Sequence, residues 1–279
     1  MASRVRSSSS GTKRIWVQML TFFTATFLIA WGTWIPLFVK PSLPRQIAFI
    51  GLFAPALAGL MTAALYGGQG SVREIVRRIT ILTFSPQWVL LSAFIMPAIY
   101  MTALGVLRVI RPREAAPLFA GNTPFFIAAS FVWLVFVTSG EEFGWRGYAL
   151  PRLLECSNSP VLISIGLGFV WGLWHLPLYL LPGQSAFPLP LFLIFTSSQG
   201  VLYTLIFVRT KGSLLPALLL HAGTDIAPRV FQLPHLPEVF WIIVDLTLTL
   251  VTTGLVLRMR GQLSASQQWH AEIASLPSE

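Results

Sequence analysis

One stretch of the sequence, residues 160–208, contains no Asp, Glu, Lys or Arg, and its one histidine, His175, is counted as neutral. A helix needs about 20 mostly apolar residues to cross a bilayer, so this stretch is too long for one crossing. The Pro- and Gly-rich segment 181–190 divides it into two helices. Charged residues make up only 10% of the 279-residue chain, whereas a soluble domain carries about 25%. This composition predicts an all-α, polytopic membrane protein. It excludes ordinary soluble enzymes, disordered chains and nucleic-acid-binding domains.

Four further uncharged runs and two apolar segments with a single Asp each predict the other membrane helices. With the two helices in 160–208 they give a bundle of about eight transmembrane helices, the others being 15–39, 47–66, 87–107, 123–138, 213–226 and 239–257. The first run is too long for a signal-peptide core and is predicted to be retained. The run 213–226 is the weakest of the set, because it is short and contains Pro216.

The Lys and Arg residues between these runs predict the orientation of the bundle. With the N-terminus in the cytoplasm, 13 of them fall on that side and 6 on the other, as the positive-inside rule requires. We therefore expect an integral protein of a bacterial plasma membrane, with a transmembrane domain, 15–257, between two cytoplasmic tails, 1–14 and 258–279. The formal net charge of +9 then reflects topology and contacts with the lipid bilayer, and no nucleic acid is expected as a partner.

The cytoplasmic connection 67–86 is predicted to hold a short helix that lies in the membrane interface. Four apolar residues have the spacing of one helix face: Val72, Ile75, Val76 and Ile79. Three basic residues lie off that face: Arg73, Arg77 and Arg78. We interpret this pattern as an anchored amphipathic linker.

The densest ionisable group in a predicted membrane helix consists of Glu141, Glu142 and Arg146, at the cytoplasmic end of the fourth helix. Inserting each such group into the hydrocarbon of a membrane costs roughly 2.5 to 3.5 kcal/mol, so ionisable residues there usually have a function. Arg146 follows Glu142 by one helical turn and is expected to pair with it. Glu141 has no such partner and is the candidate general base for water. The alternative is an Arg–Glu pair that only fixes the helix end.

Two more polar groups occur in later helices. His175 lies near the middle of the fifth predicted helix, on a face with Gly168 and Gly172 where another helix can approach closely. His221 and Asp225 lie one turn apart in the run 213–226. Each alone could be a buried hydrogen-bonding residue. Together with the glutamates, they supply what is needed to activate water and stabilise an oxyanion.

Other catalytic arrangements are absent from the sequence. It has no His-Glu-x-x-His zinc motif and no Gly-x-Ser-x-Gly nucleophile elbow. Its one cysteine, Cys156, excludes an intramolecular disulfide and is predicted to lie in a polar turn away from both membrane histidines. Asp245, in the last predicted helix, has no role in this scheme and is either protonated or paired with an arginine.

Three patterns within residues 138–228 resemble the motifs of the CPBP family, the CAAX-protease and bacteriocin-processing proteins, also called type II CAAX prenyl endopeptidases. They are EExxxR (Glu141, Glu142, Arg146), FxxxxxH (Phe169, His175) and HxxxD (His221, Asp225). The segment 51–58 and the basic stretch 72–78 resemble the lead-in to the family's catalytic half. The resemblance therefore covers residues 45–255.

The resemblance implies an eight-helix intramembrane glutamic endopeptidase whose site opens toward the cytoplasm. By motif position it implies three roles: water activation by Glu141 assisted by His175, shaping of the site by Glu142 and Arg146, and an oxyanion hole formed by His221 and Asp225. The family often has Asn at the last position, and an ionised Asp cannot donate a hydrogen bond. Asp225 is therefore expected to be protonated, to orient His221, or to belong to a metal site.

A zinc site is the alternative that the resemblance leaves open. Older descriptions of the family call its members metalloproteases, and His175, His221, Asp225 and a glutamate could in principle bind zinc. We favour a mechanism without a cofactor.

The expected partner is a membrane-embedded or lipid-modified peptide or protein, either prenylated or carrying a leader segment. The alternatives are a non-proteolytic scaffold or immunity protein of the same fold and, less favoured, a transporter. Inverted repeats with interrupted helices would support a transporter, and the sequence shows none.

Overall fold

The computed structural model describes residues 9–115, 123–157, 159–181, 187–231 and 236–263. Within these ranges the chain forms helices and no strand, which confirms the predicted all-α class. The helices are α1 (Ser9–Trp34), α2 (Pro36–Val39), α3 (Ala48–Leu52), α4 (Ala54–Arg77), α5 (Gln87–Ile110), α6 (Pro124–Gly144), α7 (Leu150–Glu155), α8 (Pro160–Trp174), α9 (Leu176–Leu180), α10 (Leu189–Arg209), α11 (Leu215–Phe231) and α12 (Glu238–Leu263). Most of the two predicted tails lies outside the described residues.

All eight predicted membrane segments contain a helix. In the described part of the chain, six helical stretches are long and apolar enough to cross a membrane: Gly11–Val39, Arg45–Thr80, Gln87–Ile110, Pro124–Glu155, Leu189–Arg209 and Glu238–Arg258. The other two predicted segments correspond to α8, of 15 residues, and α11, of 17 residues. The protein is therefore a polytopic membrane protein, and the count of eight crossings stays a prediction.

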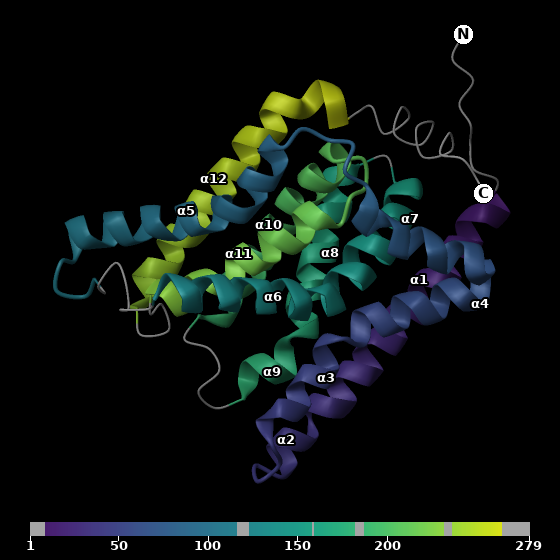
Figure 1. Cartoon of the computed structure of the whole chain (residues 1–279), viewed down its shortest axis with the longest axis horizontal. Helices are drawn as coiled ribbons and strands as arrows, with labels where there is room; N and C mark the ends of the chain where they lie inside the picture. Colours follow the sequence, from purple (N-terminus) through teal and green to yellow (C-terminus); the bar gives the residue numbers. More distant parts are fainter. Residues whose placement is uncertain (1–8, 116–122, 158, 182–186, 232–235, 264–279) are drawn as a thin grey trace.

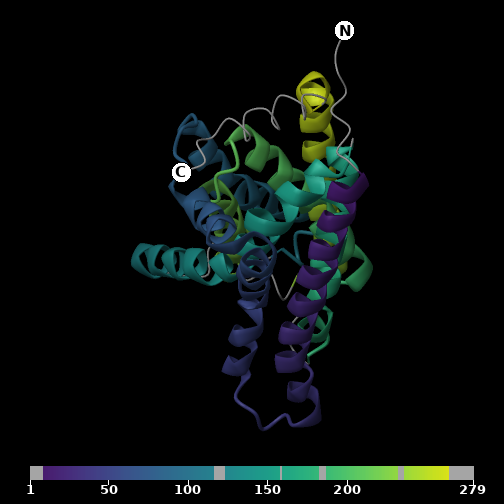
Figure 2. The same ribbon diagram turned by 90° about the vertical axis from the view of Figure 1, so that its right-hand side faces the viewer.

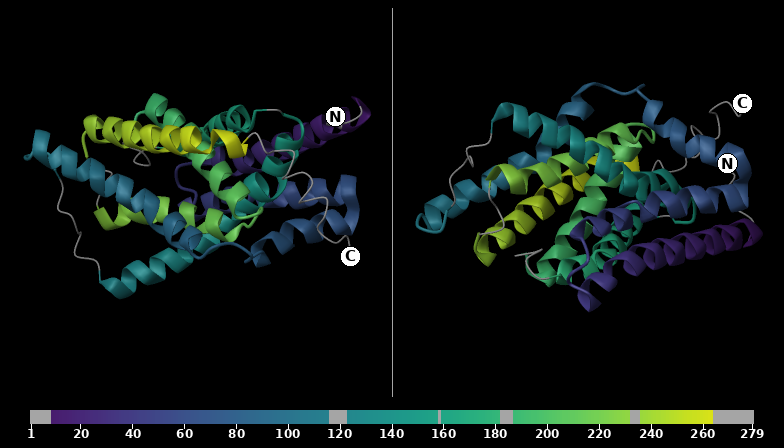
Figure 3. Two further views of the ribbon diagram at one scale, coloured as in Figure 1. Left: turned by 90° about the horizontal axis from the view of Figure 1, so that it is seen from above. Right: turned by 60° about the horizontal axis from the view of Figure 1, so that its bottom comes forward.

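The helices form a bundle with two outer pairs and a central group. Figure 1 shows α1 and α4 along one edge and α5 with α12 along the opposite side, with α8, α10 and α11 between them. Turned by 90°, the end of α1 projects beyond the rest of the bundle together with α2 and α3 (Figure 2). The right-hand view of Figure 3 shows α1 running beside α3 and α4, which it contacts. The central group carries the second and third motifs, and α6, which carries the two glutamates, packs between α4 and α11.

Helices α8 and α10 pack closely along a row of small residues. A Cβ atom at Gly168 would lie 2.3 Å from the carbonyl oxygen of Thr196, and one at Gly200 would lie 2.3 Å from the carbonyl oxygen of Ser164. No larger side chain fits there without moving the backbone. This confirms the prediction that Gly168 and Gly172 mark a face where another helix approaches.

Helix α4 changes direction at Gly68, whose φ of 66° is strained for other residues. The part beyond the kink is the predicted connecting helix, and its Ile75 is buried. Arg78 is also buried, forms an ion pair with Glu74 and donates to the carbonyl oxygen of Gly212. The expectation that Arg78 lies away from the packed face is therefore wrong, because the turn between α10 and α11 packs against it.

Candidate active site

Both glutamates lie inside one continuous helical stretch. The sequence predicted a helix end at this point. Instead, α6 runs to Gly144 and is followed directly by a π-helical segment, η3 (Trp145–Ala149), and then by α7. A Cβ atom at Gly144 would lie 2.2 Å from the carbonyl oxygen of Pro55, so α4 packs directly against the acidic segment. π-helical turns are uncommon and often occur at functional sites.

Glu142 is fully buried and is held by two partners. Its Oε1 accepts from Nη1 of Arg146 at 2.9 Å, which confirms the predicted pair one helical turn apart. The same oxygen lies 2.8 Å from Nδ1 of His221 on α11. Within the described residues, Glu142 Oε2 has no hydrogen-bond partner. The contact with His221 joins two motifs that are 79 positions apart in the sequence.

Glu141 faces the second helix of the site, α8. Its Oε2 accepts from the indole Nε1 of Trp171 at 2.7 Å and lies 3.8 Å from Nε2 of His175. His175 is not in the middle of a helix, as the sequence suggested. It lies at the break between α8 and α9, because Pro177 in the first turn of α9 favours a helix end just before it.

The partners of the two histidines determine which ring nitrogen carries a hydrogen. Nδ1 of His175 lies 2.9 Å from the carbonyl oxygen of Trp171, and a carbonyl only accepts. Nδ1 of His221 likewise faces the Glu142 carboxylate. Both rings therefore donate from Nδ1, and the tautomer of each is set by that contact. Nε2 of each ring remains for other contacts, and Nε2 of His175 is the atom nearest Glu141.

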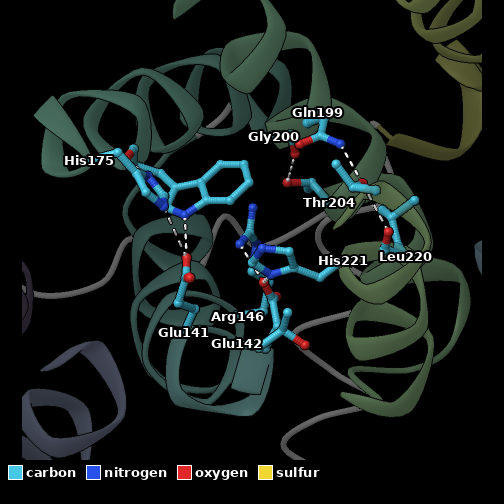
Figure 4. Close-up of polar contacts among 12 residues, drawn as sticks. Glu141, Glu142, Arg146, His175, Gln199, Gly200, Thr204, Leu220 and His221 are labelled. Carbon is cyan, nitrogen blue, oxygen red and sulfur yellow. Dashed lines mark hydrogen bonds and ion pairs between the residues drawn. The ribbon is translucent and has the colours of Figure 1, made fainter. Parts of the chain in front are cut away.

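The guanidinium of Arg146 lies between two aromatic rings. It is 4.9 Å from the ring centre of Trp171 and 3.6 Å from that of Tyr203 on α10. Trp171 in turn meets the rings of His175 and His221 edge to face, at 5.5 Å and 5.4 Å. Figure 4 shows the acidic segment and the two histidines pointing toward one another. The polar groups of three motifs thus surround one cation and its aromatic neighbours.

Trp171 and Tyr203 are site residues that the sequence analysis missed. Trp171 could have been found, because it lies one turn before His175 in the same helix. Tyr203 lies between Leu202 and Thr204 on α10, outside every motif that the sequence analysis found. Conversely, Phe169 of the FxxxxxH pattern is 44% exposed. It lies two residues from Trp171, so it points to a different side of α8.

The two aspartates differ in position and surroundings. Asp225 lies on α11 one turn beyond His221, as predicted, and is only partly buried. Asp245 on α12 is 5% exposed. In the parts of the chain that the structure describes, neither of its carboxylate oxygens has a hydrogen-bond partner. Pairing of Asp245 with an arginine is therefore excluded among those residues.

Cys156 ends α7 and is partly buried. Burial raises the pKa of its thiol, with Glu155 adding to the effect. A reactive cysteine needs the opposite shift, so this thiol is not a candidate nucleophile.

A zinc ion requires a particular set of protein ligands. Structural and catalytic zinc sites use at least three protein ligands from His, Cys, Asp and Glu. Among the described residues, no three such side chains lie together in a way that could hold a metal ion. The described residues thus form no three-ligand group for zinc, and a mechanism without a cofactor stays a prediction.

Two comparisons connect these residues to known proteins. Residues 123–227 match the family model of the type II CAAX prenyl endopeptidases, Rce1-like. The matched range contains both glutamates, Arg146, both histidines and Asp225. The chain is also similar to a protein of Methanococcus maripaludis named CAAX prenyl protease 2. The two are 24% identical over 218 residues, which cover 74% of this chain and 77% of the relative.

Proposed function

We propose that the chain is a CAAX-type endopeptidase, like the proteins of the matched family, and that it hydrolyses peptide bonds by means of a water molecule activated by Glu141. The observation that carries this proposal is the 3.8 Å separation of Glu141 Oε2 and His175 Nε2. The two atoms do not form a hydrogen bond with each other, because 3.8 Å is longer than such a bond. We propose that both atoms instead accept from one substrate water.

The tautomer of His175 supports this division of work. Its Nδ1–H donates to the carbonyl oxygen of Trp171, so Nε2 of the neutral ring is an acceptor. A water at about 2.8 Å from both acceptors can donate one hydrogen to each. As the water oxygen attacks the scissile carbonyl carbon, Glu141 takes its proton and later gives a proton to the leaving amine.

His221 is proposed to stabilise the oxyanion that forms in this step. Its Nδ1 already donates to Glu142, so Nε2 can donate as well only when the ring is protonated. With that proton, the charges of Glu141, Glu142, Arg146 and His221 sum to zero within the buried site. Donors aimed at the developing negative charge give a large part of such catalysis. Asp225, one turn away, is proposed to assist His221.

The proposed substrates are membrane-associated peptides or proteins. The relative from Methanococcus maripaludis is named for prenylated CAAX substrates, and we propose a lipid-modified or leader-bearing peptide for this chain. Glu141, Glu142 and Arg146 belong to a helical stretch, Pro124–Glu155, that is long and apolar enough to cross a membrane. A substrate that is itself held at the bilayer would reach them without leaving the lipid.

The test uses purified protein in lipid vesicles with membrane-embedded peptides, prenylated and unprenylated. Glu141→Gln keeps the shape of the side chain but cannot take a proton from water, so cleavage should fall by about 10²–10⁴-fold. Glu114→Gln is the matched control, because Glu114 is exposed and pairs only with Arg111 among the described residues. A chelator should leave the wild-type rate unchanged. Cleavage by Glu141→Gln at the wild-type rate would contradict the proposal.

A further inference from the structure

We propose that Trp171 is a positioning residue that keeps Glu141 and His175 in register for the attacking water. The inference rests on the proposed function and extends it to a position that the three motif patterns leave unspecified. Trp171 contacts both water-binding groups with different atoms. Its indole Nε1–H donates to Glu141 Oε2 at 2.7 Å, and its carbonyl oxygen accepts from His175 Nδ1 at 2.9 Å.

The indole itself has little freedom to move. Trp171 is 4% exposed, with the Arg146 guanidinium 4.9 Å from its ring centre. The rings of His175, Tyr203 and His221 meet it edge to face from three other directions. The helix that carries it is held against α10 along the glycine row that includes Gly168. The direction of the N–H bond is therefore fixed by packing from several elements.

Glu141 depends on this donor because, within the described residues, no other hydrogen bond holds its carboxylate. Glu142 is held by Arg146 and His221, whereas the Glu141 carboxylate accepts its hydrogen bond from Trp171. The last torsion of a Glu side chain is broad. Without the indole N–H, the carboxylate would rotate and the 3.8 Å relation to His175 would be lost.

The experiment compares Trp171→Phe with Trp241→Phe in vesicles, with the same peptides. Trp171→Phe keeps an aromatic ring and loses the N–H. Trp241 on α12 is the matched control, since it is buried and its Nε1 has no partner in the described part of the chain. We expect kcat of Trp171→Phe to fall by about 10- to 100-fold, with KM unchanged and a small drop in the melting temperature. Trp241→Phe should match the wild type in all three.

A second variant separates the N–H from the ring. Trp171→His keeps an aromatic N–H on a smaller ring and should retain more kcat than Trp171→Phe, even if both lose some stability. Equal activity of the Phe variant and the wild type would overturn the proposal. So would a loss that appears entirely in KM, or a His variant no better than the Phe variant. If the wild type itself cleaves nothing, the proposed function fails instead.

Discussion

Two buried carboxylates in membrane helices have opposite surroundings in this protein. Glu142 is fully buried and its Oε1 is shared by Arg146 and His221. Asp245 is almost as deeply buried, yet among the described residues nothing bonds to either of its oxygens. Burying a charge is expensive unless it is paired and hydrogen-bonded. The comparison therefore teaches that burial alone does not mark the site, and that the partners around a carboxylate do.

Removing the charge of Glu142 should have the largest effect on this comparison. Glu142→Gln leaves the Arg146 guanidinium in a buried site without its ionic partner. Breaking such a pair on one side typically costs about 3–5 kcal/mol. We expect a clear drop in melting temperature together with loss of cleavage, because His221 also loses the carboxylate that orients it. Thermal unfolding in detergent, followed next to the cleavage assay, measures both. A variant as stable as the wild type would show that the pair does not hold the site together.

A smaller effect is expected when the packing of α8 against α10, which supports the site, is disturbed. Gly168→Ala places a Cβ atom against the backbone of Thr196 on α10 and should push α8 away, so that both stability and kcat fall. Gly166→Ala is the control on the same helix, because a Cβ there has nothing within 4 Å. The control should be neutral or slightly stabilising, since Ala is favoured over Gly in helices by about 0.5–1 kcal/mol. Equal melting temperatures for the two variants would argue against close packing of α8 on α10.

The smallest effect is expected at Asp245. Asp245→Asn has no bond to break among the described residues and removes an ionisable group from a buried position. We expect cleavage within about twofold of the wild type and a melting temperature that is unchanged or higher, because uncharged groups cost less to bury. A strong loss of activity in Asp245→Asn would mean that the unpaired carboxylate has a role that the comparison misses.

Much of this site could be predicted from the sequence, because its strongest signals are local. The pair of Glu142 with Arg146 follows from their spacing on one helix. The approach of α10 follows from small residues on one face of α8. Uncharged runs located the helices for the same reason, since a membrane crossing imposes its length on the sequence.

The features that could not be predicted from the sequence depend on how helices pack against one another. The contacts of Trp171 with Glu141 and of His221 with Glu142 join residues 30 and 79 positions apart. No spacing within a helix predicts them. The burial of Arg78 is of the same kind, since it depends on the turn that holds Gly212. The break at His175 is different, because Pro177 is a local signal for it. This signal was missed because the surrounding uncharged segment was treated as one continuous helix.

Single-turnover cleavage in oxygen-18 water tests the role of Glu141 most directly. If Glu141 activates water that attacks the peptide bond, the label should enter the new carboxylate of the product. The enzyme peptide that contains Glu141 should then stay unlabelled, because its oxygens never exchange with the substrate. Mass spectrometry of the product and of the digested enzyme measures both. Label in the Glu141 peptide would show that the carboxylate itself attacks the substrate, and would contradict the account.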